Sequence, residues 1–262
     1  PIVIGLAVVG YQYVGAPRFT NPETGRSARL GLSENQETAL GLQGFREVVS
    51  QSRQVTSGPD YDTVMRVSRR LQSAIGADEH MKWEVAVLED PQQNAFCLPG
   101  GKICVYTGIL PVTRTDAGLA VVLGHEMAHA TCHHGAERVL RQNMTETAMM
   151  GVQGSMGDLD SGQQRTLMGL IGAGAQYGML LPFSRTHESE ADHVGLKYMV
   201  RAGYDPKEAV AFWTRMAEAG GSNQQPPEFM STHPLHETRI RQIQEWIPEI
   251  IATERPAQRG PE

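Results

Sequence analysis

The chain has 262 residues, of which 40% are hydrophobic, and its 29 acidic and 23 basic side chains give a formal net charge of −6. This apolar content is enough to bury a substantial core, so the sequence is that of a folded globular protein. The acidic balance, without a basic stripe interleaved with aromatic residues, gives no support to nucleic-acid binding.

The chain opens on an apolar run that is too short to span a membrane. Residues 2–9 are small and β-branched, and a Gly-, Pro- and Asn-rich stretch over 15–31 follows them like a linker. We interpret the run as the end of a removed or truncated signal or anchor segment, with an N-terminal strand as the alternative. This organisation predicts an apolar remnant and linker over 1–31, one folded domain over 32–250 and a flexible tail over 251–262.

Helices dominate the predicted secondary structure. Ser33–Gln36 is typical of a capping box, and Asp116 can cap the apolar segment that follows it. Pro206 suits the first position of a further helix. The predicted helices run from Ser33 to about Gln51, over Asp60–Ile75, from Asp116, from Ser184 to Gly203, from Asp205 and over Leu235–Trp246.

Three short segments rich in β-formers predict a small sheet. They are Trp83–Leu88, Asn94–Cys97 and Lys102–Thr107, and a Pro-Gly-Gly turn separates the last two. Together with the helices they predict an α+β, mostly helical fold. Cys97 and Cys104 flank the turn, which is compatible with a disulfide in an oxidising compartment or with small buried residues.

The most informative motif is the pentad His125-Glu126-Met127-Ala128-His129. Residues four apart on a helix lie one turn above each other, so the two imidazoles can converge on one ion, and two nitrogens without a thiolate suit Zn2+. A catalytic zinc keeps one position for water and lowers the pKa of that water. Glu126 beside it can act as general base, which predicts hydrolysis of peptide bonds.

A third ligand is predicted in the helix that begins near Ser184. Glu188 and Asp192 are four residues apart on one face, so Glu188 can bind the metal while Asp192 hydrogen-bonds a ligand histidine and fixes its tautomer. Glu190 is the rival ligand, but it points to the other side of the helix. With the pentad histidines these residues predict one Zn2+ per chain, and Cys132 is not needed as a ligand.

The residues between the two ligand segments carry weaker patterns. His133 and His134 follow the pentad and are interpreted as a polar helix end, where cationic side chains favour the dipole. Thr145–Gly162 has no clear period and is expected to be mobile near the site. Leu167–Leu181 is expected to be a buried or flap helix, because its length and glycines do not favour a membrane-contacting one.

These motifs and their surroundings resemble a known family. The segments "VVLGHEMAH", "LPFSRTHESEADHVGL" and "STHPLHETRI" are similar to those of the HtpX and CAAX-prenyl-endopeptidase family of zinc metallopeptidases, which are gluzincins, and within it to the Oma-type and bacterial LoiP- or BepA-like branch. The resemblance covers Leu32–Ile243. It implies a zincin-like fold with Glu126 as base and three zinc ligands, His125, His129 and Glu188.

The resemblance also draws attention to two residues near the C-terminus. In some relatives a histidine in an S-T-H-P segment approaches the metal, so His233 is expected to be a fourth ligand in a latent state or to support the oxyanion. A loop that leads into the last helix is the plainer interpretation. Arg239 can donate to an oxyanion, or it is a surface arginine that faces Glu237 or Glu245.

In the family, the strand that corresponds to Ile103, Cys104 and Val105 forms an edge above the zinc, where an extended peptide can bind by main-chain hydrogen bonds. A hairpin that only packs on the active-site helix is the alternative. We therefore predict a zinc endopeptidase that cleaves unfolded, damaged or membrane-associated proteins in quality control. It would be periplasmic or held at a membrane by an anchor outside this sequence. A chaperone-like binding module with a capped, latent zinc site is the alternative function.

Overall fold

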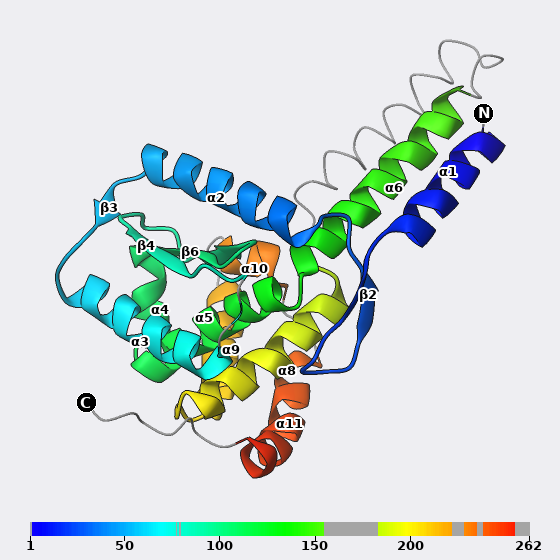
Figure 1. The fold of residues 1–262 in the computed structure, drawn as a ribbon. Coiled ribbons are helices and arrows are strands. Elements are labelled where there is room, and N and C mark those ends of the chain that lie inside the picture. Colours follow the sequence, from blue (N-terminus) through cyan, green and yellow to red (C-terminus); the bar gives the residue numbers. More distant parts are fainter. Residues whose placement is uncertain are drawn as a thin grey trace. The chain divides into compact units, whose positions relative to one another are not determined.

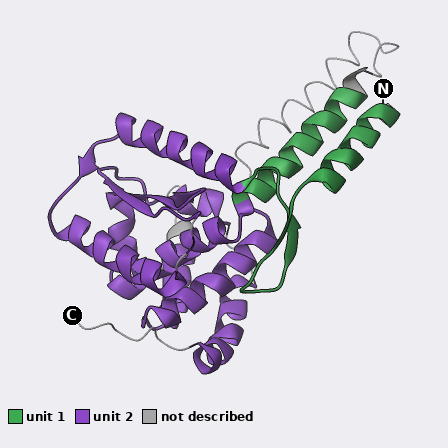
Figure 2. Cartoon of the chain, in the orientation of Figure 1, with its two compact units in different colours: residues 1–33, 135–182 green, residues 34–134, 183–262 purple. Residues whose placement is uncertain are grey.

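The computed structural model describes residues 2–76, 78, 80–154, 183–221, 228–234 and 238–254. The chain divides into two compact units (Figure 2). One unit comprises residues 1–33 and 135–182, and the other comprises residues 34–134 and 183–262. The second unit contains the sheet and every residue that the sequence singles out for chemistry, so it is described first.

This larger unit has the predicted α+β, mostly helical fold (Figure 1). Its helices are α2 (Glu34–Gln51), α3 (Pro59–Ile75), α4 (Leu110–Thr113), α5 (Asp116–Thr131), α8 (Arg185–Arg201), α9 (Glu208–Gly221), α10 (Glu228–Thr232) and α11 (Arg239–Thr253), and η1 (Thr107–Ile109) is a 3-10 turn. Only the last helix departs far from its predicted range. It runs to Thr253 and not to Trp246, because buried Ile247 and Ile250 continue its apolar face. Residues 251–253 of the tail predicted over 251–262 therefore belong to α11, and residues 255–262 lie outside the described residues.

Four strands form one sheet in the order β3-β4-β6-β5. They are β3 (Gln54–Val55), β4 (Glu84–Leu88), β5 (Ala95–Leu98) and β6 (Lys102–Tyr106). β4 and β6 are parallel, whereas β3 and β5 pair antiparallel with their neighbours. The prediction that Ile103, Cys104 and Val105 form the edge is therefore wrong. They lie in β6, which is hydrogen-bonded on both sides, and the two edge strands of the sheet are β3 and β5.

The two faces of the sheet are covered by different helices. On one face Phe45 of α2 packs against Ala86, Leu88 and Cys104. On the other, Ile103 and Val105 belong to the main core with residues of α3 and α5. This coverage explains why Ile103, Cys104 and Val105 of β6 are apolar in succession and do not alternate with polar residues, as is typical of a central strand.

The same geometry excludes the disulfide that the sequence left open. Cys97 stands opposite Ile103 in the β5–β6 ladder, so its side chain shares the face of Ile103. Cys104 is the next residue along β6 and points to the opposite face. Accordingly none of Cys97, Cys104 and Cys132 forms a disulfide, and the last two are buried. Burial raises the pKa of the Cys104 thiol to about 12.

α5 and α8 form the centre of this unit, and their first turns are capped by hydroxyl side chains. Thr115, and not the predicted Asp116, is the N-cap of α5, and its Oγ1 accepts from the Gly118 N–H at 3.0 Å. Ser184 caps α8 as predicted, accepting from the His187 N–H at 3.3 Å.

A pair of glycines brings the two central helices close together. A Cβ atom added to Gly195 of α8 would lie 3.0 Å from the carbonyl carbon of Gly124 and from the amide nitrogen of His125 on α5. Neither backbone atom can give way easily, so this crossing requires glycine. The two backbones thereby meet next to the first residue of the pentad, which is where side chains of both helices must converge.

The smaller unit contains α1 (Ile2–Gly15), β1 (Arg18–Thr20), β2 (Ser27–Arg29) and most of α6 (His134–Gly154). The apolar N-terminal run is thus helical and not a strand, and the predicted linker folds as the β1–β2 hairpin. α1 and α6 lie side by side (Figure 1), and Gln12 Nε2 donates to Thr147 Oγ1 at 3.0 Å. Among the described residues, no helix combines the length and the apolar character needed to cross a membrane.

α6 also revises the expectation for the segment Thr145–Gly162. Its first part, up to Gly154, continues α6 as a regular helix. The helix has no proline, and the contact with α1 gives it a packing partner, which the period of the sequence did not reveal. The remainder of that segment and the predicted helix over Leu167–Leu181 lie outside the described residues.

Candidate metal centre

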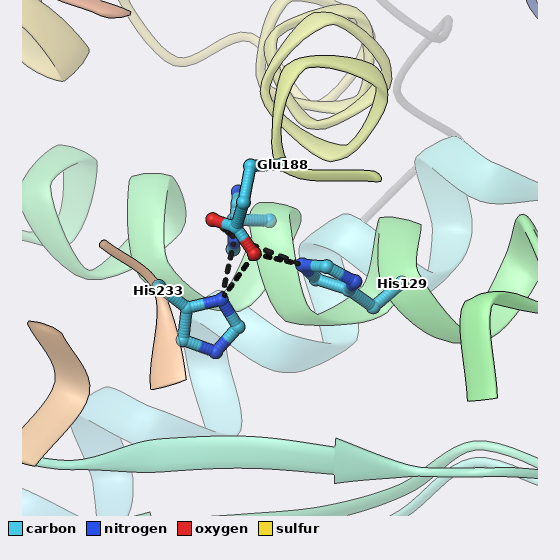
Figure 3. Close-up of side chains that lie close together, drawn as sticks. His129, Glu188 and His233 are labelled. Atoms are coloured by element: carbon cyan, nitrogen blue, oxygen red, sulfur yellow. Dashed lines mark hydrogen bonds and ion pairs between the residues drawn. The ribbon is translucent and has the colours of Figure 1, made fainter. Parts of the chain in front are cut away.

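Four buried side chains from three parts of the fold converge on one point. His125 and His129 come from α5, Glu188 from α8, and His233 directly follows α10. The Nε2 atoms of His125 and His129 are 3.1 Å apart, and each lies 3.4 Å from a carboxylate oxygen of Glu188. His233 Nδ1 is 3.0 Å from Glu188 Oε1. Figure 3 shows the Glu188 carboxylate pointing between the rings of His129 and His233.

This arrangement fits a metal ion better than it fits a hydrogen-bonded cluster. One potential ligand atom from each of the four residues lies within 4.8 Å of all the others. Glu188 Oε2 is buried without a hydrogen bond of good geometry among the described residues, although Arg239 Nη1 is 3.1 Å away. A cation would satisfy that oxygen and the facing imidazole nitrogens together. Nitrogen and oxygen ligands without a thiolate suit zinc.

Nδ1 of His125 faces away from the cluster and contacts Asp192, which in turn is paired with Arg239. His125 Nδ1 lies 2.9 Å from Asp192 Oδ1, which orients Nε2 toward the cluster. Arg239 donates to both oxygens of Asp192, from Nε at 2.7 Å and from Nη2 at 2.8 Å. Burial would raise the pKa of Asp192, but Arg239 and His125 hold it below its ordinary value.

Arg239 is not the surface arginine that the sequence offered as one alternative. It is 1% exposed, and its guanidinium lies 3.4 Å from the ring centroid of Trp213. Its hydrogen-bond donors contact Asp192 and the backbone carbonyls of His233 and Pro234, and its Nη1 is 3.1 Å from Glu188 Oε2. The two contacts with Asp192 indicate that Arg239 positions this carboxylate and, through it, His125.

The pKa values of His129 and His233 are shifted in opposite directions. Burial, together with the neighbouring His125, lowers the pKa of His129 well below 6.5, which keeps its ring neutral. Burial would also lower the pKa of His233, but Glu126 and Glu188 raise it to about 9. Burial opposes ionisation of Glu188, yet His233 and the pentad histidines lower its pKa. The negative charges of Glu126 and Glu188 therefore favour a positive charge in this cluster.

Glu126 lies between the ligand cluster and the edge of the sheet. Its Oε2 accepts from the backbone N–H of Cys97 in β5 at 3.2 Å, and its Oε1 is 3.1 Å from His233 Nε2. An edge strand has one unpaired row of backbone groups, and at Cys97 this row points to the pentad glutamate. The edge above the candidate centre is thus β5, which the sequence assigned to the hairpin but not to the edge.

Two further histidines near the centre were misread from the sequence. His133 and His134 are not a solvated helix end, because both are buried. His133 has a positive φ of 56° and separates α5 from α6. Its Nδ1 lies 2.6 Å from Oε2 of Glu37 in α2. His134 lies between His129 and Glu190. Each of these histidines contacts a glutamate in a helix that is distant in the sequence. Such contacts produce no local sequence pattern, so they could not be predicted.

The pair of His133 and Glu37 predicts a pH-dependent contribution to stability. Burial would lower the pKa of His133, but Glu37 raises it above 6.5. Because the folded pKa is raised, the contribution is complete below about pH 6.5 and is lost as the pH rises through the folded value. We expect Glu37→Gln to cost about 1–2 kcal/mol at pH 6 and less at pH 9, measured by urea unfolding of the metal-free protein. An equal cost at both pH values would contradict this assignment.

Comparisons with known proteins agree with the geometry. The model of peptidase family M48 matches residues 61–247. The chain is 36% identical over 230 residues to the mitochondrial metalloendopeptidase OMA1 of Schizosaccharomyces pombe, covering 87% of this chain and 66% of that protein. It is 32% identical over 241 residues to the OMA1 metalloendopeptidase of Danio rerio, covering 88% and 50%.

The chain is also similar to a bacterial protein. The chain is 29% identical over 222 residues to the beta-barrel assembly-enhancing protease of Yersinia pestis, covering 84% of this chain and 45% of that protein. The chain thus spans about two thirds or less of the length of these three relatives. The resemblance drawn from the motifs is confirmed: the chain belongs to peptidase family M48, and it is similar to proteins named as OMA1 metalloendopeptidases and as a beta-barrel assembly-enhancing protease.

Proposed function

We propose that the chain is a zinc-dependent endopeptidase that cleaves unfolded, damaged or membrane-associated proteins. One observation carries the proposal: the ligand cluster of two imidazoles and a buried carboxylate lies beside a glutamate that also contacts the free edge of a strand. A metal site, a base and a peptide-binding edge are three parts that suit metal-dependent hydrolysis of a polypeptide.

In this proposal His125, His129 and Glu188 hold the metal, and Asp192 keeps His125 in the tautomer that leaves Nε2 free for it. A bound zinc supplies a Lewis acid that lowers the pKa of a water molecule toward neutrality. Glu126 accepts a proton from the attacking water and later delivers it to the leaving amine. Its position 3.2 Å from the Cys97 amide places it next to the strand that a substrate would extend.

The substrate would bind as an extended segment along β5. A strand edge recognises the peptide backbone, so such binding tolerates many sequences but requires that the substrate be unfolded there. This requirement suits proteins that have lost or not yet reached their fold. Folded proteins bury or block their own strand edges and would be spared.

The names of the relatives support a role in quality control near membranes. One group is named as mitochondrial metalloendopeptidases, and the bacterial relative is named for the assembly of β-barrels. We infer a periplasmic or membrane-associated location for this chain and a domain over 32–250 that carries the peptidase. The apolar side chains on α1, of which Val3, Ile4 and Tyr11 are at least 69% exposed, are compatible with such a location.

Metal removal tests the proposal. We expect cleavage of an unfolded, casein-like protein to fall to background after dialysis against a chelator, and to return when about one equivalent of Zn2+ is added. Equivalent Mg2+ should not restore it, because Mg2+ prefers oxygen ligands. The zinc content of the restored protein is measured in parallel. Cleavage that survives complete removal of the metal would refute the zinc peptidase.

We further propose that His233 supplies a fourth ligand and closes the site in a latent state. Its Nδ1 lies in the ligand cluster with the other three residues, and four protein ligands leave no position for water. We expect His233→Ala to retain zinc and to cleave unfolded protein several-fold faster than the wild type, measured as initial rates at saturating zinc. A large loss of rate with full zinc occupancy would instead assign His233 to support of the oxyanion.

A further inference from the structure

A buried chain of hydrogen bonds leads from His129 away from the metal cluster. His129 Nδ1 lies 2.9 Å from His134 Nδ1, and His134 Nε2 lies 2.9 Å from Glu190 Oε2. The exposed fractions of these residues are 3%, 0% and 7%. Glu190, which the sequence offered only as a rival ligand, therefore points away from the cluster and contacts a second histidine.

The donors and acceptors along this chain are fixed by the ligand role of His129. Its Nε2 faces the cluster, so in the neutral ring that binds a metal the proton is on Nδ1. That N–H donates to His134 Nδ1, whose own proton is then on Nε2 and is donated to Glu190. Each contact has one donor and one acceptor, and the terminal acceptor is a carboxylate, which gives the stronger type of hydrogen bond.

The rings in this chain are also held by packing. Phe183 lies against His129 with ring centroids 4.0 Å apart. His187 stacks on His134 with centroids 4.3 Å apart and an interplanar angle of 18°. Neither imidazole can rotate without displacing an aromatic neighbour. Packing and the hydrogen bonds together therefore hold the ring of His129 in one orientation.

We propose that His134 and Glu190 are positioning residues that hold His129 in the metal-binding tautomer and orientation. The inference rests on the proposed zinc site. The two ligand histidines of α5 would then be supported alike, His125 directly by Asp192 and His129 by Glu190 through an intervening imidazole. A ligand imidazole that donates to a carboxylate is also the better electron donor to its metal.

The same residues could instead form a second metal site, and an experiment must distinguish this role from the positioning role. Potential ligand atoms of Cys132, His134 and Glu190 lie within 4.8 Å of one another, so these three side chains could hold a second ion. Both ring nitrogens of His134 already lie at hydrogen-bond distance from a partner, Nδ1 from His129 and Nε2 from Glu190. One tautomer of His134 satisfies both contacts, which favours the positioning role. The two assignments differ in the number of metal ions per chain.

The test measures metal binding in the full chain with Glu190→Gln and His134→Phe. We expect one zinc per wild-type chain, and a zinc affinity that is about 10–100-fold weaker in both variants, from competition with a chromogenic chelator. The Co2+-substituted variants should also show a shifted visible absorption spectrum, because the geometry at His129 is disturbed. Glu190→Gln is isosteric, so it remains informative if His134→Phe does not fold.

Glu37→Gln is the matched control, since it breaks the adjacent buried pair with His133 without touching a metal ligand. It should bind zinc as the wild type does. A zinc affinity of Glu190→Gln within twofold of the wild type, with an unchanged Co2+ spectrum, would overturn the positioning role and leave the peptidase proposal intact. A second zinc that is lost in Glu190→Gln would overturn it in favour of a metal site. A wild-type chain that binds no zinc would refute the proposed function itself.

Discussion

Replacement of Glu126 by glutamine should reduce cleavage of unfolded protein by about 10²–10⁴-fold while zinc remains bound, because general acid–base catalysis contributes a factor of this size. Glutamine keeps the shape of the side chain and can still accept from the Cys97 amide, so the strand above the site should stay in place. It cannot take a proton from the attacking water. The loss should therefore lie in kcat, with little change in KM.

The measurement is the initial rate of hydrolysis of a casein-like substrate at saturating zinc, alongside the zinc content of each preparation. Glu249→Gln is the matched control, because it makes the same chemical change at an exposed position of α11. It should leave the rate unchanged. If Glu126→Gln cleaves as fast as the wild type, the chain would act as a binding module, and the peptidase assignment would be lost.

The parts of the site that could be predicted are those whose geometry is local. His125 and His129 are one helical turn apart, so their convergence follows from the helix alone. Glu188 and Asp192 have the same spacing on α8, and the cap at Ser184 fixes where that helix begins. Helix periodicity and capping therefore suffice to define two ligand pairs before any tertiary contact is known.

The parts that could not be predicted depend on packing between distant segments. A strand segment does not reveal how many neighbours it has, and the position of β6 between β4 and β5 follows only from the folded order of the strands. The contact of Gly195 with Gly124, which brings the ligand helices together, is equally invisible in either helix alone.

Buried polar pairs are the second class of feature that sequence reasoning missed. From the sequence, Arg239 was interpreted as an oxyanion donor or a surface arginine, and His134 as part of a polar helix end, because polar side chains are mostly exposed. Their burial becomes tolerable only through partners that lie 47 and 56 positions away, Asp192 and Glu190. A polar side chain with a distant partner has no signature in local composition.

Replacement of Glu188 by glutamine should weaken zinc binding by about 10²–10⁴-fold, which corresponds to the roughly 3–5 kcal/mol lost when a buried charge pair is broken. Glu188 supplies the one carboxylate of the described ligand cluster, and because it is 0% exposed, bulk solvent does not screen its charge. The amide of glutamine is a neutral and poorer ligand for zinc. Because the imidazoles of His125 and His129 remain, binding should be weakened without being abolished.

Titration of the metal-free variants against a chromogenic chelator measures this effect without any assay of activity. The loss should exceed that of Glu190→Gln, because a ligand contributes more than the residue that orients another ligand. Glu249→Gln should bind as the wild type does. Circular dichroism of the metal-free Glu188→Gln protein checks that the fold persists, which is expected because neutralising Glu188 leaves Arg239 paired with Asp192. Zinc affinity equal to that of the wild type in a folded Glu188→Gln would mean that the third ligand lies elsewhere, and the cluster between α5 and α8 would lose its role as the metal centre.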